Sequence, residues 1–289
     1  ELEAGLKFLE KHFAPKIMFG QDLACFISEK SPHKVNTFSN YCPEVVIRNL
    51  GANTVVNFSV ECRITLNGVE RYKDVVLCDS LPSQKSITIP FTSWTPREVN
   101  DFEVTFMTLF SDENQSNDTV RSLLIVADLF DDFEDGPYKW LLTGDWGRDA
   151  AFVHEGNFSL STSPGGAYRN NDNSWAQSFS SFDMSSASDA VLNFWTRYFI
   201  EKNKDFGYVE ASADSGKSWH VVSEPLTGTK PRWQEVSCSL SDFCGPGCEQ
   251  VWIRFRFESD AQNTLAGWNI DNVSIKSIET KRGKTLGSV

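Results

Sequence analysis

Apolar and polar residues alternate in short runs along much of this chain, and turn-forming residues separate the runs. The clearest runs in the first half are PEVVIRNLG at 43–51, VNFSVECRITLNG at 56–68, SITIPF at 86–91 and DFEVTFMTLF at 101–110. A period of two is typical of strands with one buried face, and Asn67-Gly68 before Val69 predicts a two-residue hairpin. The pattern therefore predicts an all-β fold.

Length and charge limit the organisation and the partners. The chain has 289 residues, which is enough for two domains with hydrophobic cores, and its formal net charge is −12. This balance argues against nucleic acid or an anionic membrane and suits calcium or a neutral polymer better. No apolar run reaches the roughly 18 residues of a membrane span, and no signal peptide stands at the start. We expect Glu1 to begin a processed or excised piece.

The pattern divides the chain into four pieces. In residues 1–20, helical spacing of Leu2, Leu6, Leu9 and Phe13 before a proline predicts a short helix from an upstream domain, a helix docked on the next domain, or a linker. The predicted pieces are residues 1–20, a β-sandwich at 21–129, a second β-sandwich at 130–278 and a tail at 279–289.

The first sandwich resembles a known family in the order of its features. A strand closing on RNLGANTV, a hairpin, a TIPF strand and a last turn SDENQSNDTV succeed one another. This order resembles the bacterial Ig-like domains of the CARDB type. The resemblance implies an Ig-like β-sandwich that acts as a spacer or an adhesive module.

The second sandwich carries more specific blocks, rich in Trp, Gly and Asp. They are DDFEDGPYKWLLTGDW at 131–146, HEGNFSLST at 154–162, SFDMSSASDAVLNFWTRYFIE at 181–201, YVEASADSGKSW at 208–219 and IRFRFESD to GWNIDNVSI at 253–275. In this order they resemble the MAM-like jelly-roll modules of immune-inhibitor-A-type peptidases and the cleaved-adhesin modules of secreted bacterial peptidases. The resemblance implies a jelly-roll β-sandwich.

Asp271 stands in a strand whose other inward positions we expect to be apolar, and a buried carboxylate needs a partner. The resemblance implies a structural Ca²⁺ bridging the first and last strands, with carboxylates from Glu134 and Asp271. Carbonyl oxygens around Glu155 and Asn157 would complete a shell of six to eight oxygens. The family's commoner ending IDD is changed here, because position 272 is Asn. Alternatively, Asp271 caps the preceding turn or pairs with an arginine at 254 or 256.

The loop SPGGAYRNNDNSW is the candidate ligand site. Tyr168 and Trp175 could stack on the apolar faces of sugar rings, beside the polar residues Asn170, Asn171 and Asp172. The alternative is that Trp175 packs inside and Tyr168 caps an edge.

The segment SADSGKSW fits the Asp-box pattern at Ser212, Asp214, Gly216 and Trp219. A single box predicts a well-formed hairpin turn, in which Gly216 permits a positive φ and Trp219 packs on the hairpin. Sialidases carry several such boxes, which raises an enzyme interpretation that one box does not sustain.

Catalytic motifs are missing from the sequence. It contains no HExxH, no G-x-S-x-G and no P-loop, so we assign no catalytic residues. Carboxylate pairs such as Asp131 and Asp132 leave a glycosidase open, if they face each other across a cleft.

The seven cysteines favour an oxidising compartment, and Cys244 and Cys248 in CGPGC predict a small disulfide loop. We therefore expect a non-catalytic accessory or adhesion region of a secreted or cell-surface, bacterial-type protein. Its calcium-stabilised jelly roll would bind a glycan or an extracellular protein, next to an upstream catalytic domain. The alternative is an extracellular hydrolase, or part of one.

Overall fold

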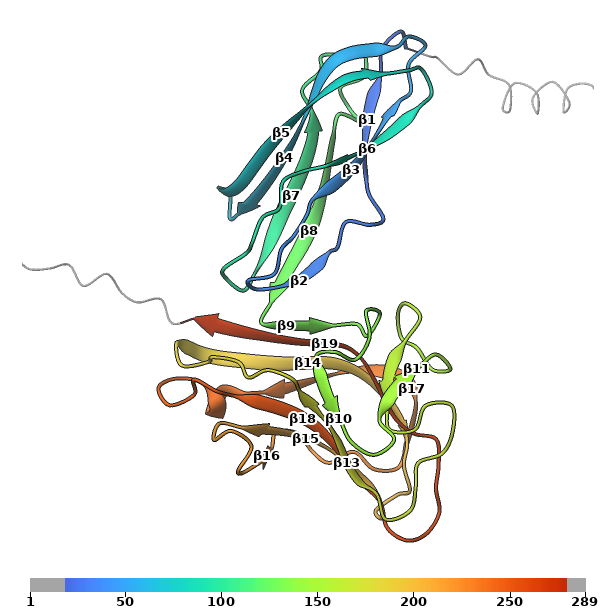
Figure 1. Cartoon of the computed structure of the whole chain (residues 1–289), viewed down its shortest axis with the longest axis vertical. Coiled ribbons are helices and arrows are strands. Elements are labelled where there is room, and N and C mark those ends of the chain that lie inside the picture. Colours follow the sequence, from blue (N-terminus) through green and yellow to red (C-terminus); the bar gives the residue numbers. More distant parts are fainter. Residues whose placement is uncertain (1–18, 280–289) are drawn as a thin grey trace, which may run out of the picture. The chain divides into compact units, whose positions relative to one another are not determined.

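The computed structural model describes residues 19–279, and the chain divides after Val126 into two compact units. Both units are built from strands, and the one helical element of the described range is a single 3-10 turn, η1 (Ser241–Phe243) (Figure 1). The predicted all-β fold of two sandwiches is confirmed. The helix expected within residues 1–20 falls mostly outside the described residues.

The first unit pairs its strands into two sheets. One sheet has the order β1-β3-β6 and the other the order β2-β8-β7-β4-β5. The strands are β1 (Leu23–Ile27), β2 (Lys34–Asn36), β3 (Glu44–Asn49), β4 (Val55–Leu66), β5 (Val69–Leu81), β6 (Ser86–Pro90), β7 (Asn100–Thr108) and β8 (Thr119–Ala127).

Local sequence explains the longest hairpin of this unit. Asn67 and Gly68 both have positive φ, 51° and 77°, and they join β4 to β5 at the pair Leu66 and Val69. A two-residue turn with positive φ at both positions suits the twist of the paired strands, so the predicted hairpin is confirmed. The inward side chains of the two sheets, Phe58, Phe102 and Phe106 among them, form one buried core.

The second unit also has two sheets. Their orders are β10-β13-β18-β15-β16 and β11-β12-β19-β14-β17, and β9 pairs with β19 beside the second sheet. The strands are β9 (Leu129–Asp131), β10 (Trp140–Leu142), β11 (Gly147–Asp149), β12 (Ser159–Ser161), β13 (Asn173–Ser178), β14 (Ala187–Phe199), β15 (Phe206–Ser212), β16 (His220–Val221), β17 (Thr229–Ser239), β18 (Trp252–Glu258) and β19 (Gly267–Glu279).

The long strand β14 shows why this unit is a sandwich. Along β14, Leu192, Phe194 and Thr196 are fully buried, while the alternate residues Trp195 and Arg197 are half-buried. The alternation sends one set of side chains into the core between the sheets and the other set to the outer face. Trp268 on the neighbouring strand is fully buried in the same core.

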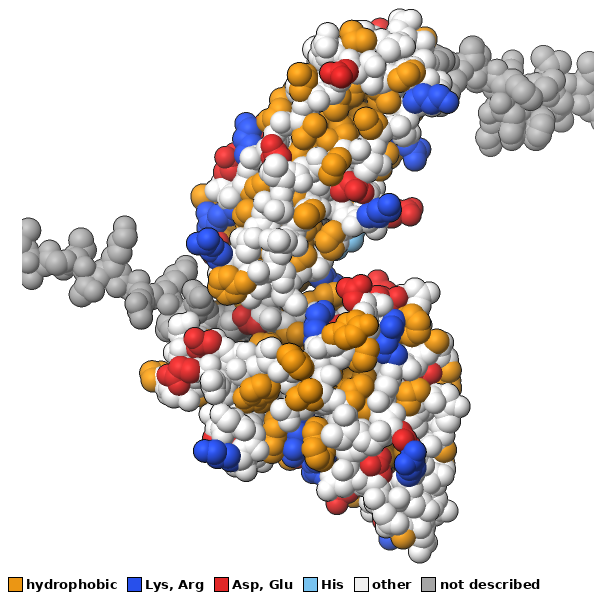
Figure 2. All heavy atoms as spheres, in the orientation of Figure 1, with side chains coloured by type: hydrophobic (Ala, Val, Ile, Leu, Met, Phe, Trp, Pro, Cys, Tyr) orange, Lys and Arg blue, Asp and Glu red, His pale blue; other side chains and the backbone are white. Residues whose placement is uncertain are grey.

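The visible surface carries charged side chains of both signs (Figure 2). On the visible face, acidic and basic side chains are interspersed, without a broad basic patch (Figure 2). No helix within residues 19–279 is both long enough and apolar enough to cross a membrane.

Candidate binding face and acidic clusters

Asp271 lies on the outer face of its sheet, although its side chain is fully buried. It pairs across the strands with Trp195 of β14, and directly paired residues point to the same face. The expectation that Asp271 points inward, among the apolar positions of its strand, is therefore wrong. A bulge after Asp271, where Asn272 has a φ of 48°, changes the register of β19 and could not be seen in the sequence.

Backbone amides, and no arginine, satisfy the Asp271 carboxylate. Oδ2 accepts hydrogen bonds from the N–H groups of His154 (3.0 Å) and Glu155 (3.3 Å), and Oδ1 accepts one from Asn272 (2.8 Å). Burial raises the pKa of Asp271 to about 6, against the opposing effect of these amides. The two alternatives from sequence are both wrong in detail: the amides come mainly from a distant loop, and Arg254 and Arg256 pair with Glu210 instead.

Glu134 holds the other end of the same loop. Its Oε1 accepts the backbone N–H groups of Asn157 and Phe158, both at 2.8 Å, and its Oε2 accepts the side-chain amide of Asn157 at 2.9 Å. These bonds lower the pKa of Glu134 against the opposing effect of desolvation. Glu155 accepts a hydrogen bond from the Asn272 side chain at 2.9 Å.

The carboxylates proposed as calcium ligands therefore contact the amide groups of the loop, whereas the proposed site requires its carbonyl oxygens. Glu134, Glu155, Asn157 and Asp271 do surround one loop, but its amide hydrogens face the carboxylates, where a cation would need oxygens. Within the described residues, the carboxylates of Glu134, Glu155 and Asp271 do not form a group with ligand atoms within 4.8 Å of one another. The structure therefore does not support this ligand set.

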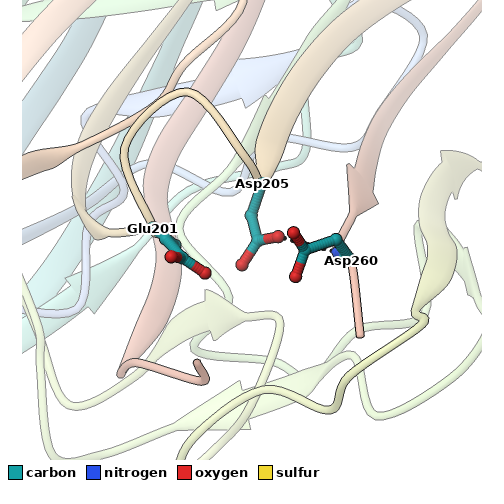
Figure 3. Close-up of side chains that lie close together, drawn as sticks. All are labelled: Glu201, Asp205 and Asp260. Atoms are coloured by element: carbon teal, nitrogen blue, oxygen red, sulfur yellow. Dashed lines mark hydrogen bonds between the residues drawn. The ribbon is translucent and has the colours of Figure 1, made fainter. Parts of the chain in front are cut away.

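A different acidic group brings three carboxylates together, although Asp205 and Asp260 each also accept one backbone N–H, from Asp260 and Gln262, at 2.8 Å. Ligand oxygens of Glu201, Asp205 and Asp260 all lie within 4.8 Å of one another, and Figure 3 shows the three carboxylates turned toward a common space. Asp205 is fully buried, and Oε2 of Glu201 is a buried atom without a hydrogen-bond partner. The salt bridges of the described residues include none of the three. This group could hold a metal ion.

Tyr168 belongs to the support of this acidic group and not to an exposed surface. Its ring is 2% exposed, and its hydroxyl donates to Asp205 at 2.6 Å and accepts the backbone N–H of Glu201 at 3.1 Å. Burial, with the bond to Asp205, raises the pKa of Tyr168. The prediction that Tyr168 is a platform for sugar rings is wrong, because no ligand can reach a ring that is buried in the core.

The other residues of the predicted ligand loop lie apart from Tyr168. Asn170 and Asn171 are exposed, and the Asp172 side chain accepts a hydrogen bond from Ser174 at 3.0 Å. Trp175 is half-buried on β13, where Arg254 lies 5.6 Å from its ring. The loop does not join its two aromatic residues into one platform.

The Asp-box residues form a compact turn between β15 and β16. Asp214 accepts hydrogen bonds from the backbone and the hydroxyl of Ser218 and from the Ser212 hydroxyl, and these bonds lower its pKa. Gly216 has a φ of 78°, and the Trp219 indole N–H donates to its carbonyl oxygen at 3.1 Å. The polar groups are used within the turn, so its role is local structure.

An aromatic cluster on the outer face of β14 and β17 was not foreseen from sequence. The His154 ring stacks on the Trp195 ring, with 3.9 Å between centroids and 13° between planes, and Trp233 of β17 lies 5.7 Å from His154. The Arg197 guanidinium lies 3.9 Å from the ring centroid of Phe152. We call these five residues the aromatic face. The alternation in NFWTRYF was the available signal, because it places a tryptophan and an arginine on one side of a strand.

The expected disulfide and the expected carboxylate pair are both absent. All seven cysteines lie in the described range and are free thiols, Cys244 and Cys248 included.

Asp131 is 1% exposed and accepts hydrogen bonds from the Trp140 indole at 2.7 Å and from Lys139 at 3.3 Å. A carboxylate bound in this way cannot face Asp132 across an open cleft, so the glycosidase interpretation of this pair is wrong.

No protein-family model matches the sequence, and no curated protein matches it significantly. Solved structures with similar folds do exist. A CARDB domain from Pyrococcus furiosus, crystallised with di-metal ions, is 23% identical over 38% of this chain and 96% of its own, with a TM-score of 0.32. The K3 cleaved adhesin domain of Lys-gingipain from Porphyromonas gingivalis is 20% identical over 52% of this chain and 98% of its own, with a TM-score of 0.37.

A xylan-binding domain of carbohydrate-binding module family 22 is 13% identical over 53% of this chain and 96% of its own, also with a TM-score of 0.37. At these TM-scores we base no inference on the matches. The MAM-like part of the expected resemblance stays a prediction.

Proposed function

We propose that this chain is a non-catalytic accessory region of a secreted or cell-surface protein, and that its second unit binds a glycan through the aromatic face. The first unit acts as a spacer. The observation that carries the proposal is the gathering of Trp195, Trp233, His154 and the Arg197–Phe152 pair on one outer sheet face.

The chemistry of the aromatic face suits a sugar. Aromatic rings with half-exposed surfaces offer area to the C–H faces of pyranose rings, while polar side chains beside them select hydroxyl groups. Glu235 is the direct cross-strand neighbour of Trp195, and Arg197 lies on the same face of β14. Because Glu235 and Arg197 bring opposite charges to the rings, we propose a neutral polysaccharide as the ligand.

Substitution of the two tryptophans tests this function. We expect Trp195→Ala and Trp233→Ala each to weaken binding to a neutral polysaccharide at least about tenfold, which corresponds to about 1.4 kcal/mol of lost stacking and burial. Affinity electrophoresis in gels containing xylan, mixed-linkage β-glucan or glucomannan measures the retardation. The matched control is Tyr138→Ala, which removes an aromatic ring that is 79% exposed and lies outside the aromatic face.

Two outcomes contradict the proposal. In one, none of these polysaccharides retards the parent protein. In the other, both tryptophan variants are retarded as strongly as the parent and as Tyr138→Ala.

We also propose that the second unit is stabilised by calcium, held by Glu201, Asp205 and Asp260. Three carboxylates that converge without an arginine or lysine ion pair in the described part of the chain repel one another, and a divalent cation removes this cost. The unpartnered Oε2 of Glu201 and the carboxylate oxygens of Asp205 and Asp260 are ligands of the type that calcium prefers. The ion would have a structural role, since it would tie the loop after β14 to the loop after β18.

Calcium titration with variants at both acidic sites tests this second proposal. A ligand present at 100 times its Kd stabilises by about 2.7 kcal/mol, so calcium should raise the melting temperature of the parent by about 5–10 °C, with EDTA reversing the shift. Asp205→Asn should abolish the shift, whereas Asp271→Asn should keep it. Differential scanning calorimetry of both variants distinguishes the two sites. A shift that is lost only in Asp271→Asn would mean that calcium binds at the site first predicted from sequence. The absence of any shift in the parent would contradict the calcium proposal.

A further inference from the structure

The loop at residues 152–158 covers the outer face of β14 and β19 and supplies part of the aromatic face. Phe152 of this loop lies over Arg197, and His154 lies over Trp195. Asp271 is the cross-strand neighbour of Trp195, so its carboxylate lies beneath the loop at the position where His154 meets the indole. The aromatic face is therefore assembled from a loop and a strand that are joined through Asp271.

Both oxygens of Asp271 are used as acceptors of N–H groups. Oδ2 takes the amides of His154 and Glu155, and Oδ1 takes the amide of Asn272. An asparagine at this position cannot replace it, because either orientation of its side chain directs an NH2 group at an N–H group. The charge and the two acceptors of Asp271 therefore fix the backbone on either side of the His154 carbonyl.

Glu134 holds the loop from its other end through the amides of Asn157 and Phe158. Gly156 lies between the two anchored stretches with a φ of 73°, and a Cβ there would lie 2.6 Å from Oε1 of Glu134. Four loop amides thus point at two carboxylates, and the glycine allows the close approach between them.

We propose that Asp271 and Glu134 are positioning residues, which hold this loop through its amides so that His154 stacks on Trp195 and completes the ligand-binding face. The part of this proposal that concerns ligand binding rests on the proposed function. The stacking itself does not, and it requires no metal ion at these two carboxylates.

NMR spectra of the histidine rings test the stacking without any ligand. The chain has four histidines, and His154→Ala identifies the resonances of His154 by their disappearance. Ring current from Trp195 should shift these resonances upfield in the parent, with EDTA present. In Asp271→Asn this shift should be lost, while the resonances of His33 and His220 stay in place. Asp183→Asn is the matched control, because Asp183 accepts a loop amide and a hydroxyl from Ser185 elsewhere in the same unit.

Binding to the polysaccharide that retards the parent tests the consequence. We expect Asp271→Asn to weaken retardation about as much as His154→Ala, and the double variant to lose no more than either single variant. An undiminished effect of Asp271→Asn in the His154→Ala background would overturn the proposal, as would an unchanged His154 resonance. If Asp271→Asn no longer melts cooperatively, Glu134→Gln is measured in its place. The His154 resonances of Glu134→Gln should then move downfield from their positions in the parent, as expected for Asp271→Asn. Unchanged His154 resonances in Glu134→Gln would overturn the proposal. If no polysaccharide binds, only the proposed function fails, and the NMR result stands by itself.

Discussion

Replacing Glu210 with glutamine should lower the free energy of unfolding of the second unit by about 3 kcal/mol, because it leaves the half-buried guanidinium group of Arg254 without its counter-charge and Arg256 with the exposed Glu258 alone. Glu210 binds both Arg254 and Arg256 on the outer face of β15 and β18, and the side chains are 5%, 15% and 17% exposed. Arg254 is also held 4.1 Å from the Trp219 ring, and Arg256 lies 4.2 Å from the Tyr208 ring. Once the carboxylate is gone, these contacts keep the two cations close together.

Denaturation by guanidinium chloride, followed by tryptophan fluorescence, measures this loss. Of the nine tryptophans only Trp94 lies before the division at Val126, so the signal reports mainly on the second unit. The control is Asp145→Asn in the same unit, which breaks the ion pair with Arg169, a side chain that is 75% exposed. Exposed pairs contribute at most about 1 kcal/mol. A loss for Glu210→Gln no larger than that of the control would show that Glu210 does not stabilise the fold through its two arginines.

The parts of the fold that could be predicted from sequence are those set by local chemistry. Asn67-Gly68 determines its hairpin by itself, since few other residues adopt positive φ at two successive positions. The alternation of β14 also depends only on neighbouring residues. A strand with a bulge is different. Asn272 adds a residue to β19, and the face of Asp271 then depends on the pairing with β14, which lies about 75 positions earlier.

The candidate sites were harder to predict, because each is assembled from distant segments. The sequence around Tyr168 suggests an exposed aromatic residue in a loop. In the structure its hydroxyl donates to the buried Asp205, which lies 37 positions away in the sequence. The aromatic face joins a loop at 152–154, one strand at 195–197 and another at 233. The sequence shows which residue types each segment offers, but only the register of β14, β17 and β19 brings them together.

Removing the Trp268 side chain should cost the second unit about 3–5 kcal/mol, which is the range for a large aromatic truncated in a packed core. Trp268 is fully buried, packs edge-on against Phe255 at 5.6 Å and Trp146 at 5.7 Å, and donates its indole N–H to Thr196 at 2.7 Å. Trp268→Ala therefore leaves a cavity, and the Thr196 hydroxyl keeps only its bond to the Asn269 carbonyl oxygen. The same fluorescence-detected denaturation measures the loss, and Leu141→Ala, at a side chain that is 47% exposed, is the control for a truncation outside the core.

Gly207 allows a second test of this packing, because the Trp268 ring lies where a side chain at position 207 would be. A Cβ at Gly207 would lie 2.8 Å from Cε3 of Trp268, so Gly207→Ala alone should destabilise by about 1–3 kcal/mol through overpacking. In the double variant with Gly207→Ala and Trp268→Ala, the new methyl group occupies part of the volume that the indole has left. The steric clash with the Trp268 ring is then absent. We therefore expect the double variant to be more stable than the sum of the single losses by at least about 1 kcal/mol. Losses that add to within about 0.5 kcal/mol would mean that the two residues do not share this volume, and that β15 and β19 do not pack against each other through Gly207 and Trp268.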